Sequence, residues 1–178
     1  MNKRETNNLM QAVQNGDENA FANLFEGFKR GVFSFVYSYV KNYYTAEDLV
    51  QEIFIKVKLK ANLYKQGTNA SAWILQIAKN TALDYLKKEN KSQVVELDEN
   101  IKGNDNDNDN ESSLVLHDVL NKHLQDEERQ IVLLHLMYGY KNKEIAEILN
   151  LPIGTVLWKY NTALKKLKEK LKEVGYER

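Results

Sequence analysis

The sequence contains no cysteine, a single proline and only eight glycines in 178 residues. Without cysteine, neither a disulfide nor a thiolate metal site can form, which agrees with a cytoplasmic protein. No apolar run approaches the length that spans a bilayer, and the first residues, MNKRETNNL, lack the apolar core of a signal peptide. We therefore expect a cytoplasmic chain with no membrane insertion.

An excess of positive charge is also missing, because 25 Lys and Arg residues balance 25 Asp and Glu residues. A protein that binds nucleic acid alone and without sequence preference usually carries a clear cationic excess. If this chain binds DNA, we expect it to need a partner protein.

Signals of an enzyme are equally scarce. His117, His123 and His135 have no metal-ligand partners at suitable spacing, and the sequence has neither a cysteine nucleophile nor a glycine-rich phosphate loop. The histidines are better explained as structural or exposed residues. We expect no metal, no cofactor and no catalytic residue.

Helical periodicity, in contrast, runs through most of the chain. Apolar residues recur at intervals of three and four, and no segment alternates long enough for a strand. With so little proline and glycine, this pattern predicts an all-α protein. The expected helices cover about 7–14, 18–44, 45–60, 71–88, 114–124, 126–137, 142–149 and 152–171.

Two local signals predict where helices begin in the first half. Asp17 is a good N-cap, because its carboxylate can accept a hydrogen bond from a free backbone N–H of the helix that follows. Thr45 followed by Asp48 resembles a capping box and predicts a helix start at 45. On that helix we expect an apolar inner face, with Asp48, Gln51 and Glu52 gathered on the polar side.

The composition changes between about 89 and 113, where Asn, Asp, Lys and Ser dominate and the run NDNDNDN occupies 104–110. Such a segment cannot bury apolar area, so we interpret it as a flexible acidic linker between two small helical domains. The expected boundaries are 1–90 for the first domain, 91–113 for the linker and 114–178 for the second domain.

The strongest pattern is in residues 142–171. Ile145, Ala146, Ile148 and Leu149 predict a short helix, Asn150 tolerates the left-handed backbone of a helix exit, and Pro152 suits the first position of a new helix. Two helices joined by so short a turn are typical of a helix-turn-helix. The residues expected to face inward on the second helix are Val156, Tyr160, Ala163, Leu164, Leu167 and Leu171.

The opposite side of this second helix carries Trp158, Thr162 and Lys165. With Thr155 and Lys159, these residues are expected to line the surface that enters a DNA major groove. Four further lysines extend the helix toward phosphates, at positions 166, 168, 170 and 172. Two alternatives stay open: Trp158 packs on a neighbouring domain, and the lysines form an ordinary solvated face.

Taken together, the segments resemble the extracytoplasmic-function (ECF) group of bacterial sigma factors, in the sigma-70 superfamily. The first-half segments are GDENAFANLF at 16–25, TAEDLVQEIFIKV at 45–57 and AWILQIAKNTALDYLKK at 72–88. The second-half segments are DEERQIVLLHL at 126–136, KEIAEILNLPIGTV at 143–156 and ALKKLKEKL at 163–171. Their order and spacing make the resemblance specific. It implies a sigma domain 2 four-helix bundle and a sigma domain 4 helix-turn-helix.

The resemblance implies an initiation subunit that directs bacterial RNA polymerase core to promoter DNA. In similar proteins the DLVQE segment docks on the clamp helices of the largest polymerase subunit, which gives this role to Asp48, Gln51 and Glu52. A rigid polar patch of this kind can pair with basic side chains of a partner helix.

The resemblance also assigns two DNA surfaces. The residues implied in melting and binding the minus-ten element are Tyr64, Lys65, Asn69, Gln76, Lys79 and Asn80. Those implied in binding the minus-thirty-five element are Thr155, Trp158, Lys159, Thr162 and Lys165. The helices of 114–137 would sit on the flap of the second-largest subunit, and an anti-sigma protein is a further implied partner.

The chain departs from many relatives at one point, where Gly154-Thr155-Val156-Leu157-Trp158-Lys159 replaces the more usual GTVKSR. Two usually polar positions of the recognition helix are thus Leu and Trp. The competing hypothesis is a stand-alone helix-turn-helix regulator that acts without incorporation into polymerase.

Overall fold

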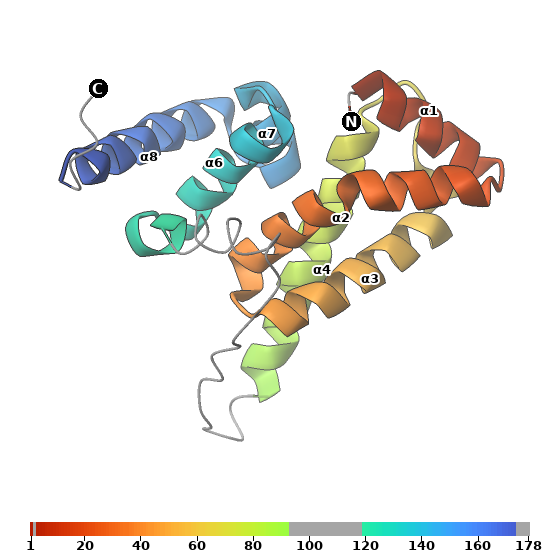
Figure 1. The fold of residues 1–178 in the computed structure, drawn as a ribbon, viewed down its shortest axis with the longest axis horizontal. Helices are drawn as coiled ribbons and strands as arrows, with labels where there is room; N and C mark the ends of the chain where they lie inside the picture. Colours follow the sequence, from red (N-terminus) through yellow and green to blue (C-terminus); the bar gives the residue numbers. More distant parts are fainter. Residues whose placement is uncertain (2, 93–118, 174–178) are drawn as a thin grey trace. The chain divides into compact units, whose positions relative to one another are not determined.

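The computed structural model describes residue 1, residues 3–92 and residues 119–173. The chain forms two compact units, one before and one after the segment 93–118 (Figure 1). Every regular element in the described residues is a helix. The predictions of an all-α protein and of two helical domains are therefore confirmed. Most of the predicted linker, the first residues of the 114–124 helix and His117 lie outside the described residues.

The first unit is built from four helices, three of which pack around α2. They are α1 (Lys3–Gln14), α2 (Glu18–Val40), α3 (Tyr43–Leu59) and α4 (Ala70–Ser92), with a short 3-10 turn at Ala61–Leu63. The helix α2 packs on α1, α3 and α4, and α4 also packs on α1 and α3. Fully buried side chains of this core include Met10, Leu24, Val32, Phe35, Val36, Ile53, Val57, Ile74 and Leu75. Burial of each large apolar side chain contributes about 1.5–3 kcal/mol.

The start of α2 agrees with the prediction and the start of α3 does not. Asp17 is the N-cap of α2, with its side chain accepting a hydrogen bond of 3.0 Å from the backbone N–H of Ala20. Helix α3 begins at Tyr43, and its N-cap is Asn42, whose side chain accepts from the backbone N–H of Thr45 at 3.0 Å. The capping box at Thr45 is therefore wrong, because Asn42 caps the helix three residues earlier.

Two other helices are longer than the sequence pattern predicted. Helix α1 begins at Lys3 rather than at residue 7. Helix α4 begins at Ala70, with the side chain of Asn69 accepting from the backbone N–H of Ala72 at 3.2 Å, and it continues to Ser92. The first residues assigned to the linker, 91 and 92, are thus helical.

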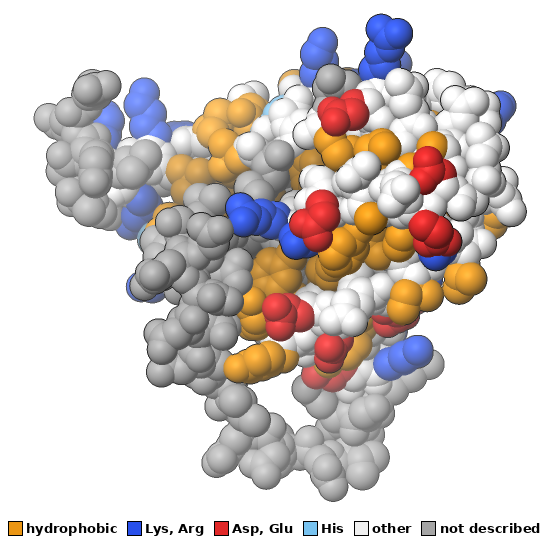
Figure 2. Space-filling view, turned by 45° about the vertical axis from the view of Figure 1, so that its right-hand side comes forward, with side chains coloured by type: hydrophobic (Ala, Val, Ile, Leu, Met, Phe, Trp, Pro, Cys, Tyr) orange, Lys and Arg blue, Asp and Glu red, His pale blue; other side chains and the backbone are white. Residues whose placement is uncertain are grey.

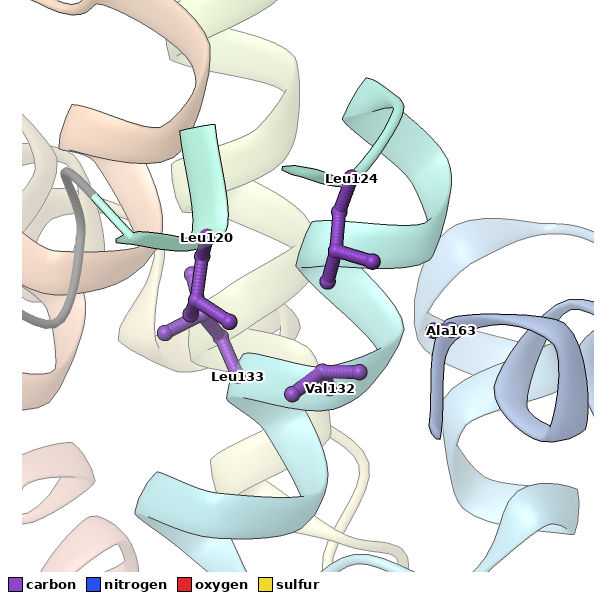
Figure 3. Close-up of a cluster of buried hydrophobic side chains, with 5 residues drawn as sticks. All are labelled: Leu120, Leu124, Val132, Leu133 and Ala163. Carbon is purple, nitrogen blue, oxygen red and sulfur yellow. The ribbon is translucent and has the colours of Figure 1, made fainter. Parts of the chain in front are cut away.

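The second unit contains a helical segment at 119–123, α6 (Asp126–Tyr138), α7 (Asn142–Leu149) and α8 (Ile153–Glu173). Helix α8 packs on both α6 and α7. The core of this unit includes a cluster of buried side chains formed by Leu120, Leu124, Val132, Leu133 and Ala163 (Figure 3). Tyr160 and Leu167 pack against this cluster. This core supports α8 from one side.

The turn between α7 and α8 confirms the helix-turn-helix. Asn150 ends α7 in the left-handed conformation, with φ of 55°. The carbonyl of Pro152 accepts a hydrogen bond of 3.2 Å from the backbone N–H of Val156, so Pro152 stands just before α8 rather than at its first residue.

One residue that was predicted to face inward on α8, Leu164, is exposed. Val156 and Ala163 are buried, whereas Leu164 is 43% exposed. Leu164 lies at the edge of the apolar stripe, and the helices packed against α8 do not cover that edge. The side chain of Leu171 lies outside the described residues.

Candidate polymerase and nucleic-acid interfaces

Helix α3 presents the predicted polar cluster to solvent. Asp48, Gln51 and Glu52 are all exposed, while Leu49 and Ile53 on the other side are buried. A salt bridge of 2.6 Å joins the carboxylate of Glu52 to Lys56, and both side chains are partly exposed. Such a pair contributes only about 0.3–0.5 kcal/mol to an exposed helix. The carboxylate of Glu52 can therefore exchange this lysine for a partner at little cost.

The same face of α3 carries two exposed apolar residues that sequence reasoning missed. Ile55 is 59% exposed and Leu59 is 78% exposed. Residues 48, 52, 55 and 59 follow one another at intervals of four, three and four, which places them on one side of a helix. In Figure 2 apolar side chains likewise reach the surface among acidic ones. The sequence does indicate this surface, because Ile55 and Leu59 do not fall at the helical positions of the buried residues of α3.

In the loop before α4, two of the residues assigned to the minus-ten element make contacts within the protein itself. Tyr64 is only 3% exposed, its ring lies 5.7 Å from that of Trp73, and its hydroxyl donates to the carbonyl of Thr68 at 3.2 Å. Asn69 is the N-cap of α4. Both side chains shape the loop from inside, while Lys65 is exposed on it.

Helix α1 anchors this loop through two side-chain amides, and no local pattern in the sequence indicates this contact. The side-chain amide of Asn7 donates to the carbonyl of Thr68 at 2.8 Å and accepts from the backbone N–H of Ala70 at 3.0 Å. The amide of Gln14 donates to the carbonyls of Ala61 and Tyr64, at 2.9 and 2.8 Å. The ends of the loop are thus fixed from a distant part of the chain.

The remaining minus-ten residues lie together on α4. Gln76 and Asn80 are exposed one helical turn apart, and Lys79 beside them is half-buried. Two amides and one ammonium on adjacent positions can donate to and accept from base edges and can neutralise a phosphate. This combination suits a single strand of nucleic acid.

The recognition helix α8 places the residues assigned to the minus-thirty-five element in different environments. Trp158 is 63% exposed. Lys165 is exposed and Thr155 is half-buried. The hydroxyl of Thr162 donates to the carbonyl of Trp158 at 2.9 Å, so its proton is already used within the helix.

Two lysines that were predicted to face DNA contact acidic residues of α6. The ammonium of Lys159 lies 3.1 Å from the carboxylate of Glu127, and its side chain is only 16% exposed. The ammonium of Lys166 lies 2.8 Å from both carboxylate oxygens of Glu128, which is buried. Sequence reasoning missed both carboxylates, although they stand in the acidic first turn of α6. They fix α8 to α6.

The end of α6 is joined to both helices of the helix-turn-helix. The ring nitrogen Nε2 of His135 lies 2.8 Å from Oδ1 of Asn142 at the start of α7. The same ring lies 4.1 Å from that of Tyr160 on α8. His135 is therefore a structural residue, as the sequence suggested. No group of three His, Asp or Glu residues in the described parts of the chain could hold a metal ion. Of the described helices, none is long and apolar enough to cross a membrane.

Comparison with known families gives two matches in chain order. The model for Sigma-70 region 2 matches residues 24–92, and the model for Sigma-70, region 4 matches residues 116–167. The first match covers most of the four-helix unit. The second covers α6, α7 and most of α8.

Curated proteins and a solved structure are similar over nearly the whole chain. The ECF RNA polymerase sigma factor SigW of Bacillus subtilis is 25% identical, over 93% of this chain and 96% of that protein. The RNA polymerase sigma factor CarQ of Myxococcus xanthus is 28% identical, over 94% and 98%. The sigma factor RpoE of Bartonella quintana, solved in complex with the anti-sigma factor NepR, shares the fold with a TM-score of 0.67 and 23% identity, over 89% of this chain and 98% of that one.

Proposed function

This chain belongs to the ECF group of the sigma-70 family of RNA polymerase sigma factors, and we propose that three of its surfaces divide the work of starting transcription. The family role is promoter selection by a subunit of RNA polymerase. A stand-alone regulator is not favoured, because both sigma regions are present in their usual order. In this role the chain works in the cytoplasm and supplies no catalytic chemistry, since polymerase forms the RNA.

The exposed face of α3 is the proposed docking surface for the clamp helices of the largest polymerase subunit. The observation that carries this assignment is the combination of Asp48, Gln51 and Glu52 with two apolar side chains, Ile55 and Leu59, on one rigid helix. Interfaces gain most of their affinity from a few residues that become fully buried, and charged neighbours contribute specificity. The acidic cluster therefore selects a basic partner helix, and the apolar pair supplies affinity.

The loop 64–70 and the polar edge of α4 form the proposed minus-ten surface. We assign direct contacts with an unpaired strand to Lys65, Gln76, Lys79 and Asn80. A base that has left the stack needs polar groups to read its edge and a cation near its backbone, and these side chains offer both. Tyr64 has a supporting role instead, because its ring is buried against Trp73.

The second unit is proposed to bind the minus-thirty-five element through α8, and polymerase through the helices that precede α7. In a helix-turn-helix the second helix enters the major groove. The helical segment at 119–123 and α6 would contact the flap of the second-largest subunit. An anti-sigma protein is a further proposed partner, because the similar RpoE structure was solved with one.

Binding and transcription assays with and without polymerase core test the proposed function. We expect the purified chain to bind promoter duplex poorly alone, because its charge is balanced. Addition of core should produce promoter binding and open complexes. Tight and specific binding of duplex by the free chain, unchanged by core, would instead support the stand-alone regulator.

A further inference from the structure

The outer face of α8 combines polar side chains, among them the exposed Asn161 and Lys165, with a large apolar one. Trp158 is the most exposed of the large apolar residues described on α8, at 63%, and Leu157 next to it in the sequence is 42% exposed. The hydroxyl of Thr162 donates its hydrogen bond to the backbone carbonyl of Trp158. The ammonium of Lys159 is paired with Glu127 and lies 5.5 Å from the centre of the Trp158 ring. The most exposed large apolar group described on this helix is thus an indole.

Duplex DNA has one apolar feature that such a surface can recognise in the major groove. The 5-methyl group of thymine projects there, and it is contacted by apolar side chains in sequence-specific complexes. Cytosine has only a hydrogen at this position, and adenine and guanine carry no methyl group at this edge. An indole flanked by a leucine can therefore distinguish thymine from the other bases through apolar contact with its 5-methyl group.

We propose that Trp158 reads the minus-thirty-five element through the 5-methyl group of a thymine, with Leu157 closing the side of that contact. This inference rests on the proposed function of α8 as the helix that enters the major groove. Lys159 is a positioning residue in this arrangement, because its pairing with Glu127 holds the ammonium beside the indole ring.

The charges along α8 favour DNA over a protein as the occupant of this surface. Lys165 follows Trp158 by two helical turns on the same side, and Lys168 and Lys172 are also exposed. An aromatic group followed by exposed cations fits a base edge with phosphates next to it. A protein partner on this surface would have to be acidic as well as apolar.

The test uses the polymerase holoenzyme on a promoter whose minus-thirty-five element has been selected from a randomised library. Each thymine of the selected element, on both strands, is then replaced by uracil, which removes only the methyl group. We expect one or two positions at which uracil weakens promoter binding about fourfold, the value of one buried carbon. Uracil in the spacer should have no effect.

Variants of the chain connect this methyl group to Trp158. With Trp158→Ala, thymine and uracil promoters should bind equally at the sensitive position, whereas Trp158→Phe should keep the preference because a ring remains. Lys165→Ala is the matched control, and it should weaken both promoters alike. Trp158 is largely exposed, so the thermal unfolding midpoint of each variant should stay close to that of the original chain.

Two results would overturn the inference and leave the proposed function intact. One is a holoenzyme that requires its minus-thirty-five duplex but ignores every uracil. The other is methyl discrimination that persists in Trp158→Ala. A holoenzyme whose transcription is indifferent to the whole minus-thirty-five duplex would contradict the proposed function of α8 itself. If Trp158→Ala then weakened only the binding of a protein partner, the surface would be a protein interface.

Discussion

The replacement of Ile55 by alanine should weaken the binding of polymerase core without destabilising the fold. The side chain loses three carbons, which are worth about 2.4 kcal/mol when completely buried, at about 0.8 kcal/mol for each. Ile55 is 59% exposed in the free chain, so about 1.4 kcal/mol is available to a partner that covers it. This corresponds to about a tenfold increase in the dissociation constant for core.

Ile53 offers a matched control on the same helix, because the chemical change is identical and the environment is opposite. Its side chain is 0% exposed, so Ile53→Ala leaves a cavity and should lower the free energy of unfolding by about 2–5 kcal/mol. At a temperature where both variants are folded, Ile53→Ala should bind core nearly as well as the original chain. The two substitutions thus separate docking from folding.

Two measurements check this prediction, a titration of labelled chain with core and a thermal unfolding curve for each variant. Unchanged affinity of Ile55→Ala for core would refute the docking role of this side chain. Unfolding of Ile55→Ala at as low a temperature as Ile53→Ala would refute it too, because Ile55 would then belong to the core of the unit.

The combined change Asp48→Ala with Gln51→Ala should weaken core binding about tenfold or more in a pull-down or titration, because it removes polar contacts of the proposed docking face. Unchanged affinity would contradict the assignment, and alanine at the exposed Asn19 and Asn23 of α2 serves as the control. Asn7→Ala should slow open-complex formation several-fold on a promoter with a fluorescent minus-ten base, since it removes two hydrogen bonds to the loop, each worth about 0.5–1.5 kcal/mol. The neighbouring Asn8→Ala should have no such effect, and equal rates for the two variants would rule out the role of the anchor.

The fold was largely readable from the sequence, because its signals are local. The 3.6-residue periodicity defined the helices, and Asp17 and Asn150 mark a helix start and a helix end where the structure has them. The start of α3 was misread because two capping residues compete within a short distance. Asn42 accepts from Thr45, so the residue read as the cap is a residue that is capped.

The contacts that shape the candidate surfaces were less predictable, because they join residues far apart in the chain. In the sequence, Asn7 and Gln14 look like ordinary polar residues of a helix. The structure shows that their side chains donate to backbone carbonyls of the segment 61–70, which contains the 3-10 turn and the loop before α4. The same holds for Glu127, whose pairing with Lys159 withdraws a cation from the outer face of α8. Tyr64 shows the converse, since an aromatic residue in a polar loop proved to be buried.

The acidic first turn of α6 gives the DNA-facing unit its own counter-ions. While Lys159 and Lys166 are paired with Glu127 and Glu128, they neutralise no phosphate. These two lysines therefore release no counter-ions from DNA. Attraction that does not depend on ion release is insensitive to ionic strength. The dependence of minus-thirty-five binding on ionic strength should therefore come from the exposed Lys165, Lys168 and Lys172 rather than from these two lysines.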